Sequence, residues 1–212
     1  MTLTFQEAVG PSIDSAAPRV KEHFLQHPGR RVYRGVMKRV WRCSGWRGKL
    51  SQPFLWIGGW THTLFSETGC DIPFELENVV TLLPDGRTSM TWTRTFHFPR
   101  ASRRFDGIMI YDPARRAIVD WLGNTKHLEV DLYAHVERGG MTITSGKQWL
   151  QLGPVRLALP EWFSGQAKVR EWDELGGRLG ISVVIHNPIL DDFFGYEGSF
   201  ERADRCEGGS TC

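Results

Sequence analysis

The sequence predicts an α+β fold: mainly an antiparallel β meander that closes into a barrel or a strongly curved sheet, with an N-terminal helix. Period-two alternation of apolar and polar residues recurs in segment after segment from residue 74 onward. Short turns containing Gly, Pro or Asp join most of these segments, which makes consecutive strands antiparallel. Since a sheet of about ten strands usually curls or closes, we expect no long exposed edge.

The 212 residues fit a single β-barrel-like domain over residues 1–205, followed by a flexible tail over residues 206–212. Cys206 and Cys212 lie in that tail, and their spacing allows either a disulfide or two free thiols. The N-terminus has no basic, apolar leader, and no segment reaches the ~18 apolar residues of a membrane span, so we expect a cytoplasmic protein. With 26 basic and 24 acidic residues, the charge balance gives no case for a nucleic-acid partner.

Helical patterning begins the chain. Residues 5–10 suit a single helical turn, and a second helix with Pro18 in its first turn is predicted to end before Pro28. Val20 and Phe24 form its apolar face. The segments predicted as strands are 31–42, 74–83, 87–98, 105–112, 117–123, 127–136, 141–152, 155–160, 167–174, 179–188 and 195–203.

The segment 49–65 differs from the rest because it is almost wholly apolar and rich in Trp. One interpretation is a short buried helix followed by a turn. The other is a lid over a pocket, with the Gly58-Gly59 pair as its hinge and Trp56 and Trp60 against the ligand. The sequence leaves both open.

Arg94 raises the main functional question, because it stands in the apolar row of a strand between Trp92 and Phe96. A buried guanidinium requires a carboxylate, several carbonyls or a ligand anion. If Asp85-Gly86 forms a two-residue hairpin loop, Glu77 lies opposite Arg94. A cross-strand ion pair and an anchor for a ligand anion are both open, and a hollow barrel would allow both. Other carboxylates that could pair with Arg94 are Glu75, Asp120 and Glu171.

Sequence signals for cofactors and metals are missing. No glycine-rich nucleotide loop, GxSxG elbow or HExxH helix occurs. His127 and His135 share a strand face, but at 3.3 Å per residue they lie roughly 26 Å apart, too far for one ion. We therefore expect no cofactor and no metal site.

Acid–base candidates lie on the later strands. His186 ends the segment 179–188 and shares a face with Ser182. It suits either a strand-end histidine bound to backbone or a general acid or base at the mouth of a pocket. Glu171, on the neighbouring strand, and Asp131 are carboxylates that could exchange a proton with a substrate.

A family resemblance is carried by the strand VYRGVM, by Trp92-x-Arg94-x-Phe96, and by a closing region that runs from LALPEWFSGQAKVREW through LGISVVIHNPIL to GYEGSF. These stretches resemble a bacterial family, domain of unknown function 4166, whose members occur alone or fused to saccharopine-dehydrogenase-like proteins. The chain departs from the family pattern in ILDDFFG, where the family more often has a Gly soon after the Pro. The resemblance implies no activity. The positions that it carries over are Arg94, Glu171, Pro188, Tyr196 and Gly198.

The aromatic load of 9 Trp and 12 Phe favours a pocket for an apolar ligand. We predict that the barrel binds an apolar or amphipathic small molecule, and that it could catalyse a cofactor-free acid–base reaction such as a cyclisation or an isomerisation. The alternatives are a non-catalytic lipid or metabolite carrier, an accessory domain for an oxidoreductase partner, and a filled sheet that acts in protein association; a homodimer is also open. The catalytic candidates are His186, Glu171 and Asp131, and the ligand-binding candidates are Arg94, Trp92, Phe96, Glu77, Tyr196, Trp56 and Trp60.

Overall fold

The computed structural model describes residues 2–203, so the predicted tail with Cys206 and Cys212 lies outside the described residues. The helices are α1 (Thr4–Val9), the 3-10 helix η1 (Gly10–Ser15), α2 (Pro18–Phe24), α3 (Gly45–Thr61) and the 3-10 helix η2 (Glu161–Phe163). The strands are β1 (Gly29–Arg42), β2 (Gly69–Leu82), β3 (Thr88–Phe98), β4 (Ala101–Asp112), β5 (Ala117–Leu122), β6 (Leu128–Glu137), β7 (Gly140–Leu152), β8 (Val155–Ala158), β9 (Gln166–Glu174), β10 (Arg178–Asn187) and β11 (Asp191–Arg202).

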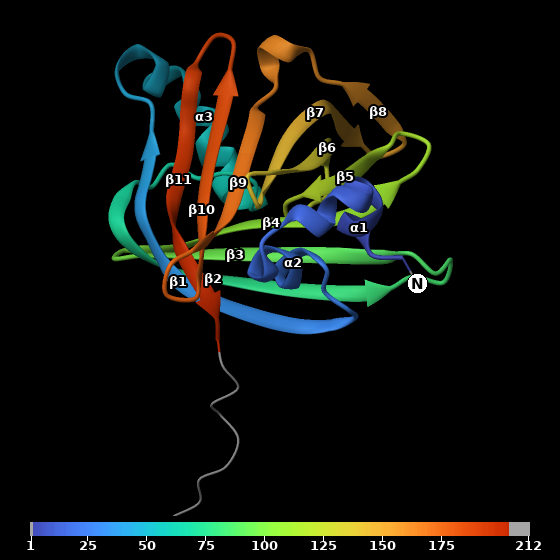
Figure 1. Ribbon diagram of the computed structural model, residues 1–212. Helices are drawn as coiled ribbons and strands as arrows, with labels where there is room; N and C mark the ends of the chain where they lie inside the picture. Colours follow the sequence, from blue (N-terminus) through green and yellow to red (C-terminus); the bar gives the residue numbers. More distant parts are fainter. Residues whose placement is uncertain (1, 204–212) are drawn as a thin grey trace, which may run out of the picture.

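Ten of these strands form a closed antiparallel barrel (Figure 1). Each strand from β1 to β7 pairs with the next one along the chain, and β9, β10 and β11 continue the series. The ring closes where β11 pairs with β1 and β9 pairs with β7. The short β8 pairs with the far end of β7 outside the ring. The predicted meander, its closure and the N-terminal helix are confirmed.

Glycines allow β1 and β11 to approach each other closely. A Cβ atom on Gly35 would lie 2.1 Å from the carbonyl oxygen of Ser199, and one on Gly198 would lie 2.3 Å from that of Val36. Neither position has room for a side chain. The register of the pair also shifts after Met37, which marks a β-bulge. Bulges and strand glycines bend strands, and bending is what closes a barrel.

The two ends of the barrel are covered by different helices. In Figure 1, α1 and α2 lie over the opening that faces the viewer, and α3 lies behind β10 and β11. Phe5 of α1 and Phe24 of α2 stand 5.9 and 5.8 Å from the ring of Trp92, centroid to centroid. These rings fill the end of the barrel beneath α1 and α2 with an aromatic core.

The β2–β3 hairpin has a three-residue loop instead of the predicted two-residue loop. The backbone N–H of Leu83 donates to the carbonyl oxygen of Arg87 at 2.8 Å, so the loop is Pro84-Asp85-Gly86. Gly86 has a φ of 85°, the left-handed conformation that such loops require.

The extra loop residue shifts the register by one, and the prediction that Glu77 faces Arg94 is therefore wrong. Arg94 is opposite Leu76, and Glu77 is opposite Thr93. A slip of one residue moves a side chain to the other face of the sheet. On the outer face, Glu77 accepts two hydrogen bonds from Arg30, at 2.7 and 3.0 Å.

The Trp-rich segment forms helix α3, as the helix-and-turn interpretation predicted. The helix ends at Thr61, and the C-cap residue His62 that follows it has a φ of 56°. A Cβ atom on Gly58 would lie 2.8 Å from the carbonyl oxygen of Leu64, so this glycine is required for close packing of the returning chain. The helix is not buried as expected, because several of its large apolar side chains face outward.

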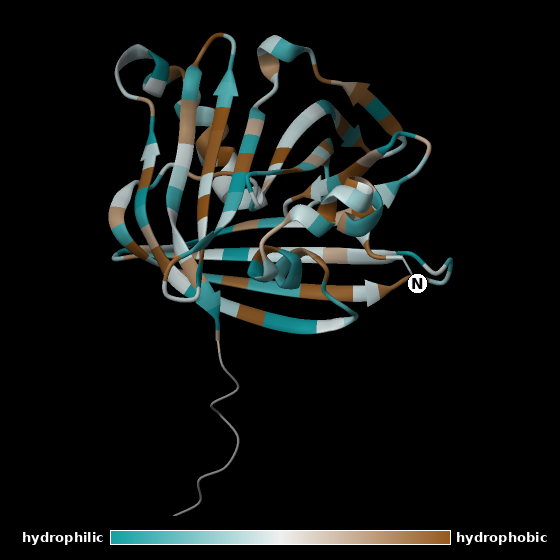
Figure 2. Ribbon diagram, viewed as in Figure 1, coloured by the Kyte–Doolittle hydropathy of each residue, from teal (hydrophilic) through white to brown (hydrophobic). Residues whose placement is uncertain are grey.

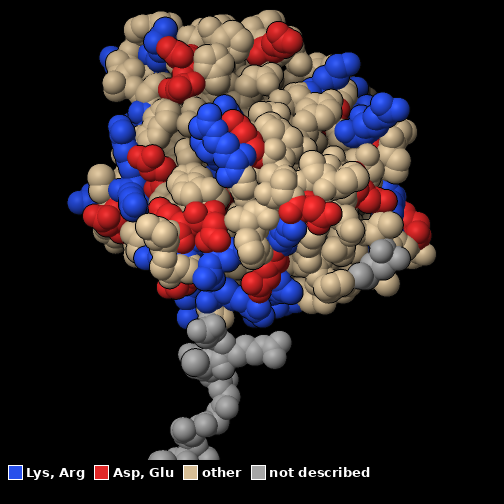
Figure 3. Space-filling view, in the orientation of Figure 1, with Lys and Arg blue, Asp and Glu red and all other residues tan. Residues whose placement is uncertain are grey.

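The surface of the barrel carries a mixture of charges. Short hydrophobic and hydrophilic stretches follow one another along the strands (Figure 2), as expected when alternate residues face the core. On the face drawn in Figure 3, basic and acidic side chains are interspersed. None of the helices within residues 2–203 combines the length and the apolar character needed to cross a bilayer.

Candidate functional site: a cavity inside the barrel

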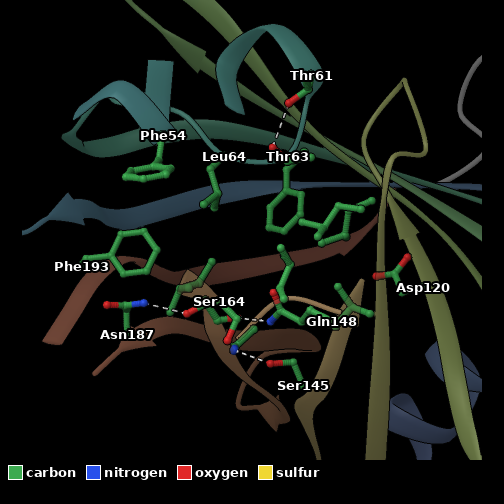
Figure 4. Close-up of a pocket in the computed structure, with 18 of the residues that line it drawn as sticks. Phe54, Thr61, Thr63, Leu64, Asp120, Ser145, Gln148, Ser164, Asn187 and Phe193 are labelled. Atoms are coloured by element: carbon green, nitrogen blue, oxygen red, sulfur yellow. Dashed lines mark hydrogen bonds between the residues drawn. The ribbon is translucent and has the colours of Figure 1, made fainter. Parts of the chain in front are cut away.

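A cavity of about 540 Å³ lies inside the barrel, on the side of Trp92 that faces α3. This volume is in the range of small-molecule sites. Its wall is built by α3, the loop after α3, the inner faces of β3 to β7 and β9 to β11, and the loop around η2. Figure 4 shows Phe54, Leu64 and Phe193 on one side of the cavity and Asp120 on the other.

The wall is mostly apolar and carries few charges. Of the described residues that line it, Arg94 is the only Lys or Arg, and Asp120 is the only Asp or Glu. An apolar cavity with a small number of placed polar groups is the usual form of a ligand site, in which those groups fix the ligand's orientation.

Arg94 reaches the cavity from β3 and is 8% exposed. Its guanidinium carbon lies 4.8 Å from the ring centroid of Trp92 and 4.8 Å from that of Phe105. Within residues 2–203, Glu77 forms an ion pair with Arg30, and Arg94 itself makes no ion pair. Cation–π contacts offset only part of the cost of removing a guanidinium from water. Arg94 is therefore the group in the cavity that most requires an anion.

Asp120, on β5, is the acidic residue of the cavity wall, and its carboxyl interacts electrostatically with Arg94. A Cβ atom on Gly107 would lie 2.7 Å from Oδ1 of Asp120, so the glycine on β4 makes room for the carboxyl. Burial raises the pKa of Asp120 to about 7, while the charge of Arg94 and a backbone hydrogen bond from Ile108 act in the opposite direction. Near neutral pH this carboxyl is close to half-protonated and can either accept or donate a proton.

Glu171 and His23 form a fully buried pair behind the cavity wall. Oε2 of Glu171 lies 3.3 Å from Nε2 of His23, without the geometry of a hydrogen bond. Burial raises the pKa of Glu171 to about 8, against the effect of Arg94. Burial, with the charges of Arg94 and Arg31, lowers the pKa of His23 to about 3. Both groups are mainly uncharged at neutral pH, so neither neutralises Arg94.

These pKa shifts predict how stability depends on pH. The folded state holds the Glu171 proton more tightly than the unfolded state, so this stabilisation is lost as pH rises from about 4.5 to about 8. His23 acts in the other direction, costing stability as pH falls from 6.5 to about 3. At pH 9 we expect Glu171→Gln to unfold at higher urea than the wild type, with a free energy of unfolding that is higher by about 1–3 kcal/mol. At pH 5 we expect a smaller difference.

The matched control for that prediction is Glu75→Gln, because Glu75 lies on the surface and pairs with Arg34. Urea unfolding of the three proteins at pH 5, 7 and 9 makes the comparison. An equal loss of stability between pH 5 and pH 9 in wild type and Glu171→Gln would show that Glu171 does not hold its proton in the folded state.

Polar side chains fix one side of the cavity mouth. Between its pairings with β9, which end at Thr144, and with β8, which begin at Trp149, the backbone of strand β7 is bound on that edge by the N–H of Leu159, which donates to the carbonyl oxygen of Gln148 at 2.9 Å. Ser145 and Gln148 add side-chain bonds there, the first by accepting a hydrogen bond from the backbone N–H of Ala167 at 2.7 Å and the second by donating to the carbonyl oxygen of Gly165. Asn187 donates to the carbonyl oxygens of Trp162 and Ser164 at 3.0 and 2.8 Å. Figure 4 shows hydrogen bonds made by Asn187, Gln148 and Ser145.

Three of the predicted ligand-binding residues line the cavity: Arg94, Trp92 and Tyr196. Phe96 is fully buried and packs against other aromatic rings, at 5.0 Å from that of Tyr196. Phe96 therefore belongs to the core beside the cavity.

Trp56 and Trp60 lie on the outer side of α3 and are not among the residues of the cavity wall. Their rings contact each other, 4.8 Å apart, and both are exposed. The same helix lines the cavity with Leu50, Phe54 and Ile57 instead. The prediction placed the right segment at the cavity but the wrong side chains.

The three predicted catalytic residues are not brought together, and none lines the cavity. His186 faces outward, with Nδ1 3.0 Å from Oδ1 of Asp192, so the inward orientation that an acid–base role at the mouth of a pocket requires is not observed. Asp131 is buried on the outer side of the sheet, 3.2 Å from Arg115. Glu171 faces inward but lies behind the wall. Alternation shows which residues share a face, and it does not by itself show which face is the inner one.

His186, Asp191 and Asp192 place one ligand atom each within 4.8 Å of one another on the surface. All three side chains are exposed, and Asp191 also lies 3.4 Å from Arg47. Surface ion pairing accounts for this group without a metal.

Several residues of the cavity wall were not predicted from the sequence as site residues. The sequence indicates Asp120 only as a partner for Arg94, and it does not single out Asn187, Gln148 or Ser145. A signal for Asn187 was present, because it lies on the face opposite His186, with Ile185 and Val183. Gln148 and Ser145 gave no signal, since their role depends on the stretch of β7 between its pairings with β9 and β8.

Fold and site together define a closed, ten-stranded antiparallel β-barrel with a mostly apolar internal cavity that contains one buried arginine. The chain belongs to the family described as domain of unknown function (DUF4166), whose family model matches residues 17–200. The matched range contains every residue that lines the cavity. The uncharacterized protein YndH of Bacillus subtilis (strain 168) is 38% identical over 159 residues, which cover 74% of this chain and 77% of that protein. No solved structure matches the chain.

Proposed function

We propose that the chain binds an amphipathic small molecule with a single acidic head group inside the barrel. The observation that carries this proposal is the guanidinium of Arg94, which is buried at an apolar cavity without an ion pair in the described part of the chain. The volume of about 540 Å³ and the apolar wall support an aliphatic or aromatic body for the ligand. A carboxylate, sulfonate or phosphate monoester would provide the missing negative charge.

The position of Arg94 sets the orientation of the ligand. Arg94 stands next to Trp92, deep in the barrel, whereas the mouth is lined by Phe54 and Phe163. The acidic head group therefore enters first, and the apolar body fills the space toward α3. Such an arrangement removes both the charge and the apolar surface of the ligand from water.

Binding can be measured with 8-anilinonaphthalene-1-sulfonate, whose fluorescence rises in an apolar site, and with its displacement by lipids. We expect palmitate to displace this probe, and hexadecanol, which has the same chain but no charge, to displace it at least roughly tenfold less well. Equal displacement by both would show that the cavity takes apolar chains without a role for Arg94. No fluorescence increase and no displacement would end the proposal.

The pKa of Asp120 predicts a pH dependence for that probe, which stays ionised throughout. Asp120 becomes negative as pH rises through about 7, and then competes with the sulfonate for Arg94. We expect probe affinity to fall by about tenfold between pH 6 and pH 8.5. In Asp120→Asn the affinity should stay at its low-pH value across this range, and the control Asp131→Asn should keep the wild-type slope. A wild-type affinity that is constant with pH would place Asp120 outside the binding site.

Asp120 also supports a second candidate function, cofactor-free proton transfer such as an isomerisation or a cyclisation. A carboxyl with a pKa of about 7 in a water-poor cavity can act as a general base or acid, and Arg94 could stabilise the charge that develops. Ligand that co-purifies with the protein should then incorporate deuterium from D₂O with wild type and not with Asp120→Asn. A carrier would give no exchange with either protein. The idea of an accessory domain for an oxidoreductase partner rests on the family resemblance alone.

A further inference from the structure

The buried face of helix α3 consists mostly of small residues. Gly48, Ser51, Leu55 and Gly58 are its buried residues, and Leu55 is the only large apolar side chain among them. They are spaced three or four positions apart, so they form one face of the helix.

The opposite face of α3 carries the large apolar side chains and turns them toward water. Trp46, Leu50, Phe54, Ile57 and Trp60 again follow a spacing of three or four, and together with the exposed Trp56 they are called the outer face of α3 below. Trp46 is 63% exposed and Trp60 is 69% exposed. A helix at the surface of a water-soluble protein normally has the reverse arrangement. An apolar patch of this kind marks an interaction surface.

The outer face of α3 is continuous with the mouth of the cavity. Six large apolar residues both line the cavity and have exposed side chains, and together they are called the rim below: Leu50, Phe54, Ile57, Trp162, Phe163 and Ile189. The rings of Phe54 and Phe163 are 5.3 Å apart, so α3 and η2 meet at the rim. An apolar surface therefore runs without interruption from outside the protein into the barrel.

The chemistry of this surface fits a lipid bilayer. Trp is the residue that favours the boundary between headgroups and acyl chains, and the outer face and the rim contain four exposed Trp residues, Trp46, Trp56, Trp60 and Trp162. Over its whole length α3 has two basic residues, Arg47 and Lys49, and no Asp or Glu. Arg47 is paired with Asp191, which leaves Lys49 to meet anionic headgroups. The helix does not have the length and apolar character to span a bilayer, and an interfacial helix needs neither.

We infer that the outer face of α3 and the rim dock on the surface of a lipid bilayer, with α3 lying in the plane of the headgroup–acyl boundary. The mouth of the cavity then opens toward the acyl chains. An amphipathic ligand can move between bilayer and barrel without its apolar body crossing water. The docking stands on the exposed face of α3, and it does not depend on the ligand proposed above.

Flotation with large unilamellar vesicles tests this inference on the ligand-free protein. Vesicles of phosphatidylcholine alone, and of phosphatidylcholine with phosphatidylglycerol, are the probes. We expect wild type to float with both, and more with the anionic mixture. The double variant Trp46→Ser/Trp60→Ser should bind roughly tenfold or more weakly, because two large apolar side chains no longer enter the interface. Brominated phosphatidylcholine should quench the fluorescence of wild type and quench the variant much less.

The matched control is Leu175→Ser, since Leu175 is 99% exposed and lies in the β9–β10 turn, away from the rim. It should float like wild type. Circular dichroism and thermal unfolding confirm that the variants fold, and binding of the sulfonate probe without vesicles reports separately on the cavity. Absence of wild-type flotation, or equal flotation of the double variant, would overturn the inference. So would a wild-type dimer that the Trp substitutions convert to a monomer, because a second copy would then cover this face.

Discussion

Arg94→Met is expected to lower the affinity for palmitate by about 100-fold while leaving the protein folded. The variant can no longer donate charge-assisted hydrogen bonds to the carboxylate of the ligand inside the cavity. The folded state loses little stability, because Arg94 makes no ion pair within residues 2–203 and Met keeps most of the volume between Trp92 and Phe105. The affinity for hexadecanol should change by less than about threefold, since the alcohol has no charge to lose.

The control for this variant is Arg30→Met, which removes the surface partner of Glu77. It should bind palmitate like wild type. Titration with the displaced fluorescent probe gives the affinities, and thermal unfolding gives the stabilities. If Arg94→Met unfolds, Arg94 is a structural group that the interior of the barrel requires. If it binds palmitate like wild type, Arg94 is not the anchor.

Val183→Phe is expected to abolish binding of every ligand, charged or neutral, by at least about 100-fold. Val183 points into the cavity from β10, opposite Tyr196 on β11. A phenyl ring at this position occupies the space that the ligand needs, and the cavity has room for it, so overpacking costs little stability. The same titrations measure the effect.

The neighbouring substitution Val184→Phe is the matched control, because Val184 faces away from the cavity. Wild-type binding is expected for it. Ile143→Phe, at another cavity position on β7, repeats the test with a different backbone environment. Full binding by both cavity variants would place the ligand somewhere other than inside the barrel.

The sequence was sufficient for the architecture because the barrel depends on local signals. Alternation along β2 to β7 and glycine-containing turns between the strands are properties of short segments, and consecutive pairing follows from them. The pairing of β7 with β9 could not be predicted in the same way. These two strands are not consecutive, because β8 lies between them in the chain and itself pairs with β7.

The position of Arg94 was predicted correctly, whereas its neighbours were not. Its place in the apolar row between Trp92 and Phe96 was enough to put it inside the barrel. The error at Glu77 came from one residue in a turn: Pro84-Asp85-Gly86 forms a three-residue loop, and sequence alone does not separate this loop from a two-residue one.

Functional residues that depend on tertiary packing were beyond the sequence. Asp120 has an unusual pKa because Gly107, on another strand, leaves space for its carboxyl inside the barrel. The orientation of α3 was also hidden: the segment 49–65 is apolar on nearly all sides, so the pattern did not indicate that Trp56 and Trp60 face water. In such a helix the packing of Gly48 against Cys43 and of Gly58 against Leu64 decides which side is exposed.

The most direct test of the account is the pKa of a bound carboxylate. ¹³C NMR of palmitate labelled at its carboxyl carbon measures this pKa. With wild type, we expect one bound resonance that keeps the chemical shift of an ionised carboxylate well below the pH at which free palmitate takes up its proton. In Arg94→Met, any bound resonance should titrate at higher pH than in wild type. A bound resonance that titrates identically in the two proteins, or no bound resonance at all, would contradict the claim that Arg94 holds an acidic amphiphile inside this barrel.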